Sequence, residues 1–282
     1  MVIIMKKNEK NLKPKRKLRK QVIVIILLFF VSLACFSLYK VLMWRQDNKE
    51  IKEQVEKIEE SVTIEQVKED ETIEVNPPEE KESDYWYYIK MPLISVDFNE
   101  LLNKNKDTIG WIKVNGTNIN YPVVQTKDND YYLTHAFDKT YNDAGWIFMD
   151  FRNDINNLSN NNIIYGHSRL DKSMFGSLKN ITKSNWYKNK DNYIIKLSTP
   201  EKNTMWQVFS VYRIPTESYY ITTEFSSNDE YQKFIDTISG RSIYEFNAKP
   251  NVNDKILTLS TCADGDKKVV MHAKLIKEAV RN

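Results

Sequence analysis

The chain has 282 residues, of which 41% are hydrophobic and 12% aromatic, so it is long enough for one or two domains with a packed core. The formal net charge of +3 is unevenly distributed, because nine lysines and arginines crowd into the first 20 residues, whereas the portion after Arg45 is mildly acidic. An acidic exported portion makes nucleic acid a poor candidate partner, and we predict none.

An uncharged apolar run occupies residues 22–39, directly after the basic leader. Eighteen such residues are about the minimum that spans a bilayer as an α-helix, at roughly 1.5 Å per residue. Tyr39 and Trp44 suit the membrane interface. By the positive-inside rule we predict a basic cytoplasmic tail at 1–20, a transmembrane signal-anchor helix at 21–43 and an extracellular remainder.

Two other kinds of leader fit this segment less well. A cleaved signal peptide would share the basic start, but the apolar run is long and no clear small-x-small cleavage site follows it. A lipoprotein signal ending at Cys35 would need a better match than Ser-Leu-Ala before the cysteine. We therefore expect Cys35 to be an apolar residue of a membrane helix.

Residues 44–84 are predicted to form an acidic extracellular linker or stalk. Fifteen acidic residues face five lysines between Asp47 and Asp84. One narrow helical stripe is formed by Ile51, Val55, Ile58 and Val62. A short stalk helix, even a weak dimer seam, is one interpretation. We favour a solvated spacer, because the stripe covers barely two heptads.

The segment 85–282 consists of short apolar runs separated by turns, as expected of strands. We predict strands at 110–114, 119–124, 146–150, 162–166, 192–197, 205–214, 255–261 and 268–276, the first two paired through Asn115-Gly116. We predict helices at 98–104 and at 228–239, the second with a capping box from Ser227 to Glu230 and an end at Gly240. Eight strands with few intervening helices favour a mainly β fold, a closed or nearly closed eight-stranded β-barrel with a few peripheral helices.

Cys262 ends the run TLSTC and is the only cysteine outside the predicted membrane helix. It has no intrachain disulfide partner, so core packing, an intermolecular bridge and a reactive thiol remain open. The position of Cys262 between a strand and the loop 263–266 favours the reactive thiol, because functional groups gather at such strand ends.

A nearby imidazole is the usual means of favouring a thiolate, and the chain has three histidines. His167 follows the strand-like run NIIYG, so its ring is expected at a strand end, as Cys262 is. His135 is flanked by aromatic residues and is expected to pack or cap locally. His272 lies inside a predicted strand and is expected to be a structural residue.

Attack on an acyl group develops an oxyanion, which a positioned cation or donor stabilises. Lys267 and Lys268 lie just past the loop, although a solvated charge is an equal alternative for each. The scattered histidines and the single exported cysteine lack metal-ligand spacing, and no glycine-rich phosphate loop occurs. We therefore predict no metal site and no cofactor.

Several ordered motifs resemble the sortases. The matching stretches are TLSTC followed by VVMHAKL, and far upstream IIYGHSRLDKSMFGSL. DTIGWIKVNGTNINYPVVQTKDNDYYL and GWIFMDFRN are similar to class B members in particular, and the similarity covers roughly Ser83 to Lys277.

The resemblance implies an eight-stranded barrel and a membrane-anchored cysteine transpeptidase of a Gram-positive bacterium. Such enzymes cleave the C-terminal sorting signal of surface proteins after a threonine and transfer the acyl group to an amine of a cell-wall precursor or a pilin. The resemblance thus implies a single-pass protein of the cell membrane, with its catalytic domain outside at 85–282. We expect the loops between about Arg213 and Asn253 to determine which signal is recognised.

The resemblance also implies residue roles, with Cys262 as the nucleophile and His167 as the general acid/base. The residues implied to line the peptide groove are Asn129, Leu133, Tyr165 and Ser260. Sortases typically carry an arginine at the start of the last strand, where this chain has Lys268. Lysine keeps the charge but lacks the planar fork of arginine, so we expect Lys268 to stabilise the oxyanion less well. An arginine from elsewhere, or a slow or specialised enzyme, is the alternative.

Two other functions share part of this pattern. A secreted cysteine protease would use the same pair, but papain-like enzymes place the cysteine near the start of a helix and ahead of the histidine. A non-catalytic surface or adhesion protein would have Cys262 merely packed.

Overall fold

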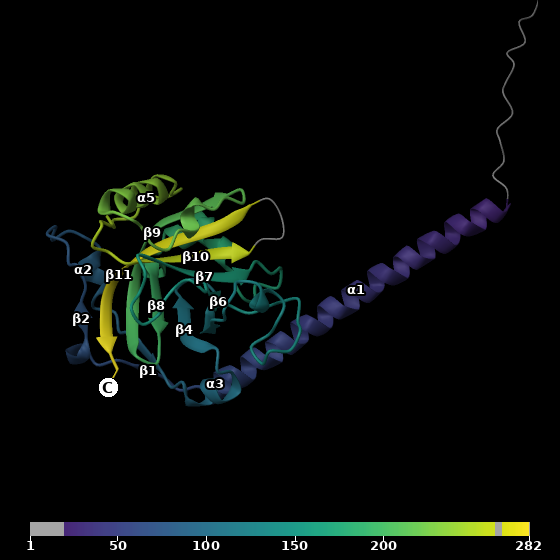
Figure 1. Ribbon diagram of the computed structural model, residues 1–282, viewed down its shortest axis with the longest axis horizontal. Helices are drawn as coiled ribbons and strands as arrows, with labels where there is room; N and C mark the ends of the chain where they lie inside the picture. Colours follow the sequence, from purple (N-terminus) through teal and green to yellow (C-terminus); the bar gives the residue numbers. More distant parts are fainter. Residues whose placement is uncertain (1–19, 263–266, 282) are drawn as a thin grey trace, which may run out of the picture. The chain divides into compact units, whose positions relative to one another are not determined.

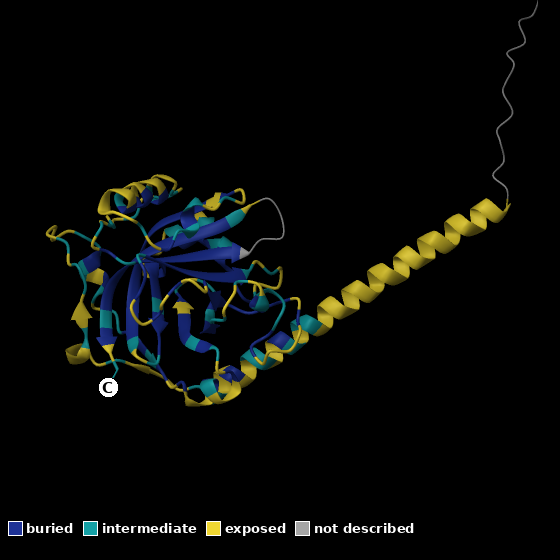
Figure 2. Ribbon diagram, viewed as in Figure 1, coloured by how far each residue is buried: buried dark blue, intermediate teal, exposed yellow. Residues whose placement is uncertain are grey.

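The computed structural model describes residues 20–262 and 267–281, with Cys262 described by its backbone alone. The chain divides into two compact units, Met1–Gln46 and Asp47–Asn282. Helix α1 (Lys20–Ser61) contributes to both units. Of the described helices it alone is long and apolar enough to cross a membrane, although a signal sequence meets the same criteria. All its side chains as far as Gln46 are exposed (Figure 2).

The larger unit contains the predicted β-barrel (Figure 1). Its strands are β4 (Thr108–Val114), β5 (Asn120–Val124), β6 (Phe148–Met149), β7 (Asn161–His167), β8 (Ile194–Ser198), β9 (Lys202–Ile214), β10 (Ile256–Cys262) and β11 (Lys268–Val280). They pair in the order β10-β7-β6-β5-β4-β8-β9-β11, and β11 pairs again with β10 to close the ring. All eight predicted strands are confirmed. Two neighbouring pairs, β5–β6 and β7–β10, are parallel, and the others in the ring are antiparallel.

Two apolar clusters pack on opposite faces of the barrel wall. The larger contains the fully buried Trp111, Trp146 and Trp206, together with Leu257 and Leu259 of β10. The smaller lies beneath helix α5 (Asn228–Gly240), which covers the outside of the barrel (Figure 1). Because side chains alternate along a strand, β10 presents its leucines to the first cluster and its even-numbered residues to the other face.

The short helices largely follow the sequence expectations. α3 (Asn99–Lys104) and α5 are confirmed, and α2 (Tyr85–Tyr88) and α4 (Ser184–Tyr187) are single turns. The Ser227 hydroxyl accepts a hydrogen bond from the Glu230 backbone N–H at 3.2 Å, as in a capping box. The Glu230 carboxylate binds Ser226 instead of returning to Ser227, and Gly240 is the last helical residue of α5.

The acidic segment that precedes residue 85 differs from a solvated spacer. The last part of α1 buries Ile51 and Ile58, which are 1% and 4% exposed, and Val55 and Val62 pack against the same cluster. Strand β1 (Ile64–Gln66) pairs with β3 (Ile94–Val96), and β2 (Ile73–Glu74) pairs with β11. The apolar stripe is therefore covered by the core of the folded unit.

Ile51→Ala should therefore lower the free energy of unfolding by about 2–5 kcal/mol, because it leaves a cavity in the core of the larger unit. Chemical denaturation followed by tryptophan fluorescence measures this change. The neighbouring Lys52→Ala is the control, since Lys52 is exposed and its substitution should change stability by less than about 0.5 kcal/mol. Equal stabilities of the two variants would show that the helix does not belong to the folded unit.

Candidate active site

The parallel pairing of β7 and β10 brings the two predicted catalytic positions together. In its register the Cα atom of Cys262 is the partner of that of His167, and Ser260 is the partner of Tyr165. Parallel strands end at the same edge of a sheet, so both residues lie at one rim of the barrel. For Cys262 the strand register gives the position of the backbone alone. The predicted loop 263–266 lies outside the described residues.

The imidazole of His167 is oriented by a main-chain acceptor. Its Nε2 lies 2.7 Å from the carbonyl oxygen of Leu133, at the end of the 3₁₀ turn η2 (Tyr131–Leu133). A carbonyl can only accept, so Nε2 must carry a proton. In the neutral ring Nδ1 is then the basic nitrogen, which is the assignment that a general base requires.

Gly145 makes room for the His167 ring. Its φ of +60° favours glycine, and a Cβ atom there would lie 2.5 Å from the carbonyl oxygen of Tyr132 and 3.0 Å from Cδ2 of His167. The Leu133 carbonyl and Gly145 thus lie along the same Nε2–Cδ2 edge of the ring. Leu133 is predicted to line the peptide groove, and the contact that it makes with His167 is through its carbonyl oxygen.

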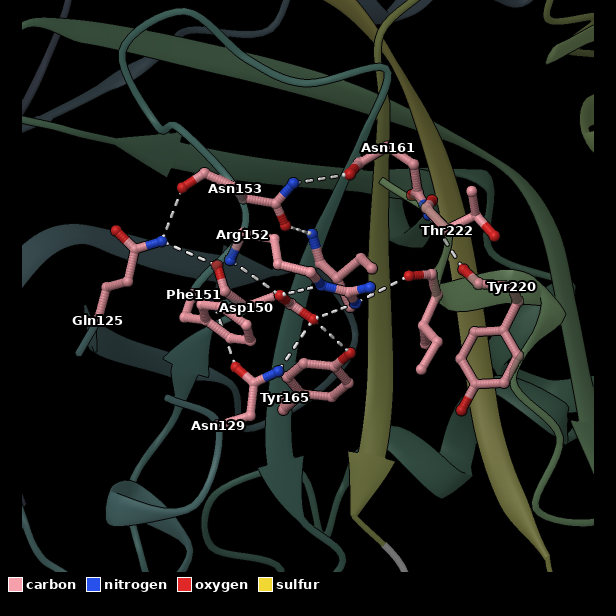
Figure 3. Close-up of polar contacts among 12 residues, drawn as sticks. Gln125, Asn129, Asp150, Phe151, Arg152, Asn153, Asn161, Tyr165, Tyr220 and Thr222 are labelled. Carbon is pink, nitrogen blue, oxygen red and sulfur yellow. Dashed lines mark hydrogen bonds and ion pairs between the residues drawn. The ribbon is translucent and has the colours of Figure 1, made fainter. Parts of the chain in front are cut away.

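Asn129 and Tyr165 meet at a carboxylate that the sequence analysis did not assign, that of Asp150 (Figure 3). Asp150 follows β6 and is fully buried. Its Oδ2 accepts from the Tyr165 hydroxyl at 2.9 Å, from Asn129 Nδ2 at 3.1 Å and from Arg152 Nη2 at 2.7 Å. Its Oδ1 accepts from Arg152 Nε at 2.8 Å and from the Arg152 backbone N–H at 3.0 Å.

The electrostatics of Asp150 follow from these contacts. Burial pushes the pKa of Asp150 up, but the hydrogen bonds from Arg152 and Tyr165 outweigh it and hold the pKa below its ordinary value. Asp150 is therefore an anion at neutral pH, and Arg152 is its counterion. The signal that could have revealed the pair is an aspartate directly after an apolar strand with an arginine two positions later, in MDFR.

Ser260 is fully buried, and its hydroxyl lies 3.0 Å from that of Tyr220. Tyr220 belongs to the 3₁₀ turn η5 (Tyr219–Ile221), within the segment predicted to recognise the sorting signal. The structure thus joins Ser260, on the strand that ends at Cys262, to the segment for which that role is predicted.

Lys268 is the first residue of β11 and is half-buried, whereas Lys267 is exposed. β11 borders β10 on the side away from β7, in a register that runs to the pair Ser260 and Val270. On the other side of β11, Arg213 of β9 lies across from Val269, so alternation puts Arg213 on the opposite face from Lys268. Lys268 thus lies on the face of Val270, at the start of β11, whereas Lys274 lies on the same face farther along the strand.

The other two histidines lie as expected. His135 stacks on Tyr131 with ring centroids 4.0 Å apart, and its Nδ1 lies 2.8 Å from the Tyr131 carbonyl oxygen. His272 is completely buried, with Nε2 2.7 Å from the Tyr212 hydroxyl and Nδ1 2.8 Å from that of Thr258. Among the described residues, no three His, Cys, Asp or Glu side chains gather in a way that could hold a metal ion.

Comparison with known proteins places this geometry in one family. A family model described as the sortase domain matches residues 112–276. The chain is 40% identical over 184 residues to sortase B of Staphylococcus aureus (strain NCTC 8325 / PS 47), a match that covers 64% of this chain and 75% of that protein. It is 36% identical over 188 residues to sortase B of Listeria monocytogenes serovar 1/2a (strain ATCC BAA-679 / EGD-e), covering 64% and 74%.

Solved structures of sortase B proteins share this fold. A Staphylococcus aureus sortase B–substrate complex superimposes with a TM-score of 0.60 at 39% identity, covering 64% of this chain and 84% of that one. Clostridium perfringens sortase B superimposes with a TM-score of 0.60 at 37% identity, covering 64% of this chain and all of that one.

The burial of His272 predicts a pH dependence of stability. Burial lowers the pKa of His272 to about 3, below the value of about 6.5 expected in the unfolded chain. As the pH falls, His272 is therefore protonated in the unfolded state at a higher pH than in the folded state. The contribution of neutral His272 to stability is complete above pH 6.5 and is lost as the pH falls toward 3, at up to about 1.4 kcal/mol per pH unit.

His272→Gln should flatten this slope in denaturation curves measured between pH 7 and pH 4. Leu170→Gln, at an exposed position without an ionisable group, is the control and should keep the slope of the parent protein. An unchanged slope in His272→Gln would contradict a neutral, buried imidazole at this position.

Proposed function

The chain belongs to the sortase family, and from this premise we propose that it is a membrane-anchored class B cysteine transpeptidase with Cys262 as nucleophile and His167 as general acid/base. The observation that carries the proposal is the register of β7 and β10, which pairs these two positions at one barrel rim. The hydrogen bond from Nε2 of His167 to Leu133 supports the same roles, because it leaves Nδ1 as the basic nitrogen.

In the first half-reaction the Cys262 thiolate attacks the carbonyl carbon of the threonine in a sorting signal. A bond forms between sulfur and carbon, and the tetrahedral intermediate carries the charge on oxygen. The peptide C–N bond then breaks, and protonated His167 donates its proton to the departing amine. The acyl group remains on Cys262 as a thioester.

In the second half-reaction an incoming amine attacks the thioester carbonyl and passes a proton to His167. The C–S bond breaks, and the thiolate of Cys262 is released. The acceptor is an amine of a cell-wall precursor or of a pilin, with water as a slow substitute. The solved substrate complex of a related sortase B supports a peptide signal as the donor.

Lys268 is proposed to stabilise the oxyanion together with a backbone N–H. The antiparallel register of β10 and β11 ends at Ser260 and Val270, and continuing it by two residues would set Lys268 opposite Cys262. β10 would then carry the nucleophile between the acid/base on β7 and the cation on β11. Asn129, Leu133, Tyr165 and Ser260 are proposed to form the peptide site beside them.

The apolar part of α1 is proposed to anchor the enzyme in the cell membrane. The basic leader favours a cytoplasmic N-terminus, so the catalytic domain would lie outside the cell. This location suits an enzyme whose donor and acceptor are both at the cell surface.

Cys262→Ala and His167→Ala should each lower the transpeptidation rate at least about 1,000-fold while leaving the thermal unfolding temperature nearly unchanged. The assay uses peptides that contain Thr-Gly or Thr-Asn, with triglycine as the amine, and mass spectrometry to detect the adduct on Cys262 and the transfer product. Full acyl-enzyme formation in His167→Ala would remove His167 from the first half-reaction. Hydrolysis that triglycine does not suppress would identify a protease instead.

Lys268→Ala should lower turnover about 100-fold, since the loss of one oxyanion donor typically costs that much or more. Lys268→Arg should match or exceed the parent enzyme, because a guanidinium can bind two oxygen atoms at once. Exposed Lys267→Ala serves as the control and should be neutral. Unchanged turnover in Lys268→Ala would exclude Lys268 from the mechanism.

A further inference from the structure

Asp150 and Arg152 join parts of the candidate site that lie far apart in the sequence. We infer that they form a positioning pair, which fixes the η5 turn relative to Asn129 and Tyr165 and so determines which sorting signal the enzyme accepts. This inference rests on the proposed function. It assigns the pair no contact with the reacting atoms.

Asn129 and Tyr165 are held by the carboxylate of Asp150 (Figure 3). The Asn129 side chain is fixed at both ends, because its Oδ1 accepts from the Phe151 backbone N–H at 3.0 Å. The Tyr165 hydroxyl and the Asn129 amide are therefore engaged within the protein. Asp150 thus fixes the orientation in which these two side chains face a bound peptide.

Arg152 extends the connection to the opposite segment. Its Nη2 donates to Asp150 at 2.7 Å and also to the Ile221 carbonyl oxygen at 2.9 Å, so one guanidinium bridges the end of β6 and the η5 turn (Figure 3). Only a planar, multivalent cation can make these contacts together with the Nε bond to Asp150. A lysine would have one nitrogen for three acceptor positions.

The η5 turn has a second support that does not depend on Arg152. Asn161 Nδ2 donates to the carbonyl oxygens of Tyr220 and Thr222 at 3.0 and 2.8 Å (Figure 3). The Tyr220 hydroxyl also contacts that of Ser260. Loss of Arg152 should therefore loosen the Ile221 end of the turn without unfolding it. The side chain of Arg152 is 39% exposed, so its replacement leaves no large cavity.

Two other polar features of the larger unit lie apart from the predicted peptide site. One is a pocket of about 310 Å³ at the β4–β5 turn, whose lining includes the uncharged side chains of Asn115, Asn118 and Asn192. The buried ion pair of Lys274 with Asp254 connects β11 to the preceding loop and faces no site. The Asp150–Arg152 pair is set apart because its side chains form hydrogen bonds with Asn129, Tyr165 and the backbone of Ile221, which all belong to the predicted peptide site or recognition segment.

The test uses the full chain in detergent micelles and the variants Arg152→Gln and Arg152→Lys. Lys190→Gln is the matched control, since Lys190 forms a 3.0 Å ion pair with Asp84 away from these segments. In both Arg152 variants we expect amide hydrogen exchange at 219–222 to rise at least tenfold. Arg152→Gln should also lower the unfolding temperature, because it leaves the buried Asp150 carboxylate without its counterion. Arg152→Lys keeps that charge, so its unfolding temperature and its rate of Cys262 alkylation by iodoacetamide should stay near those of the parent.

Kinetics on a library of pentapeptides ending in Thr-Gly or Thr-Asn, with triglycine as the acceptor, provide the second measurement. For the preferred peptide we expect KM to rise about tenfold and kcat to change less than threefold. The preference for that peptide over the next best should shrink at least fivefold. A merely structural defect would instead lower kcat in step with stability, and Arg152→Lys, which keeps the charge beside Asp150, would then restore the KM and the peptide preference of the parent.

Unchanged exchange at 219–222 in Arg152→Gln would overturn the inference, whether or not the library contains a substrate. Unchanged KM and peptide preference in the presence of Cys262-dependent turnover would overturn it as well. Turnover that persists in Cys262→Ala would instead refute the proposed function, and the exchange measurement would still decide the role of Arg152.

Discussion

The parallel pairing of β7 with β10 is the constraint on which the rest of the site depends. Most neighbouring strands of the barrel are antiparallel, and an antiparallel pair would put the ends of these two strands at opposite rims. The position of Cys262 beside His167 is thus set by backbone register. A slip of one residue would turn every side chain of β10 to the other face. β11 closes the ring on the far side of β10 and so fixes the strand from both directions.

Buried polar side chains make that register specific. Asn162 Nδ2 donates to the Ile256 carbonyl oxygen at 3.0 Å, and the Thr258 hydroxyl donates to Asn161 Oδ1 at 2.5 Å. Because this hydroxyl has one hydrogen, it must accept from Nδ1 of His272, which in turn leaves Nε2 to accept from a tyrosine. Each bond left unmade in a shifted register would cost about 1–3 kcal/mol. The same bonds that fix β10 therefore also specify the neutral state of His272.

The sequence predicted the parts of this protein that local patterns determine and missed those that depend on distant partners. Alternating apolar runs and turn residues were sufficient for all eight barrel strands and for α5. Nothing near Ile51 indicates which surface will cover it, so its stripe was attributed to a spacer. The role of Leu133 is carried by a carbonyl oxygen, which every residue type has, so no residue pattern could reveal it. Asp150 was missed because two of its partners, Asn129 and Tyr165, come from other segments of the chain.

Closure of the barrel by β10 and β11 has a consequence for the order of folding. β10 and β11 are the last described strands, and two further barrel strands and two α-helices separate β7 from β10 along the chain. Contacts between segments so distant form late in folding, after the intervening chain has been ordered. The pairing that sets the backbone of Cys262 beside that of His167 is therefore among the last contacts of the barrel to form. A partly folded chain keeps the two positions apart, and they meet only when the ring closes.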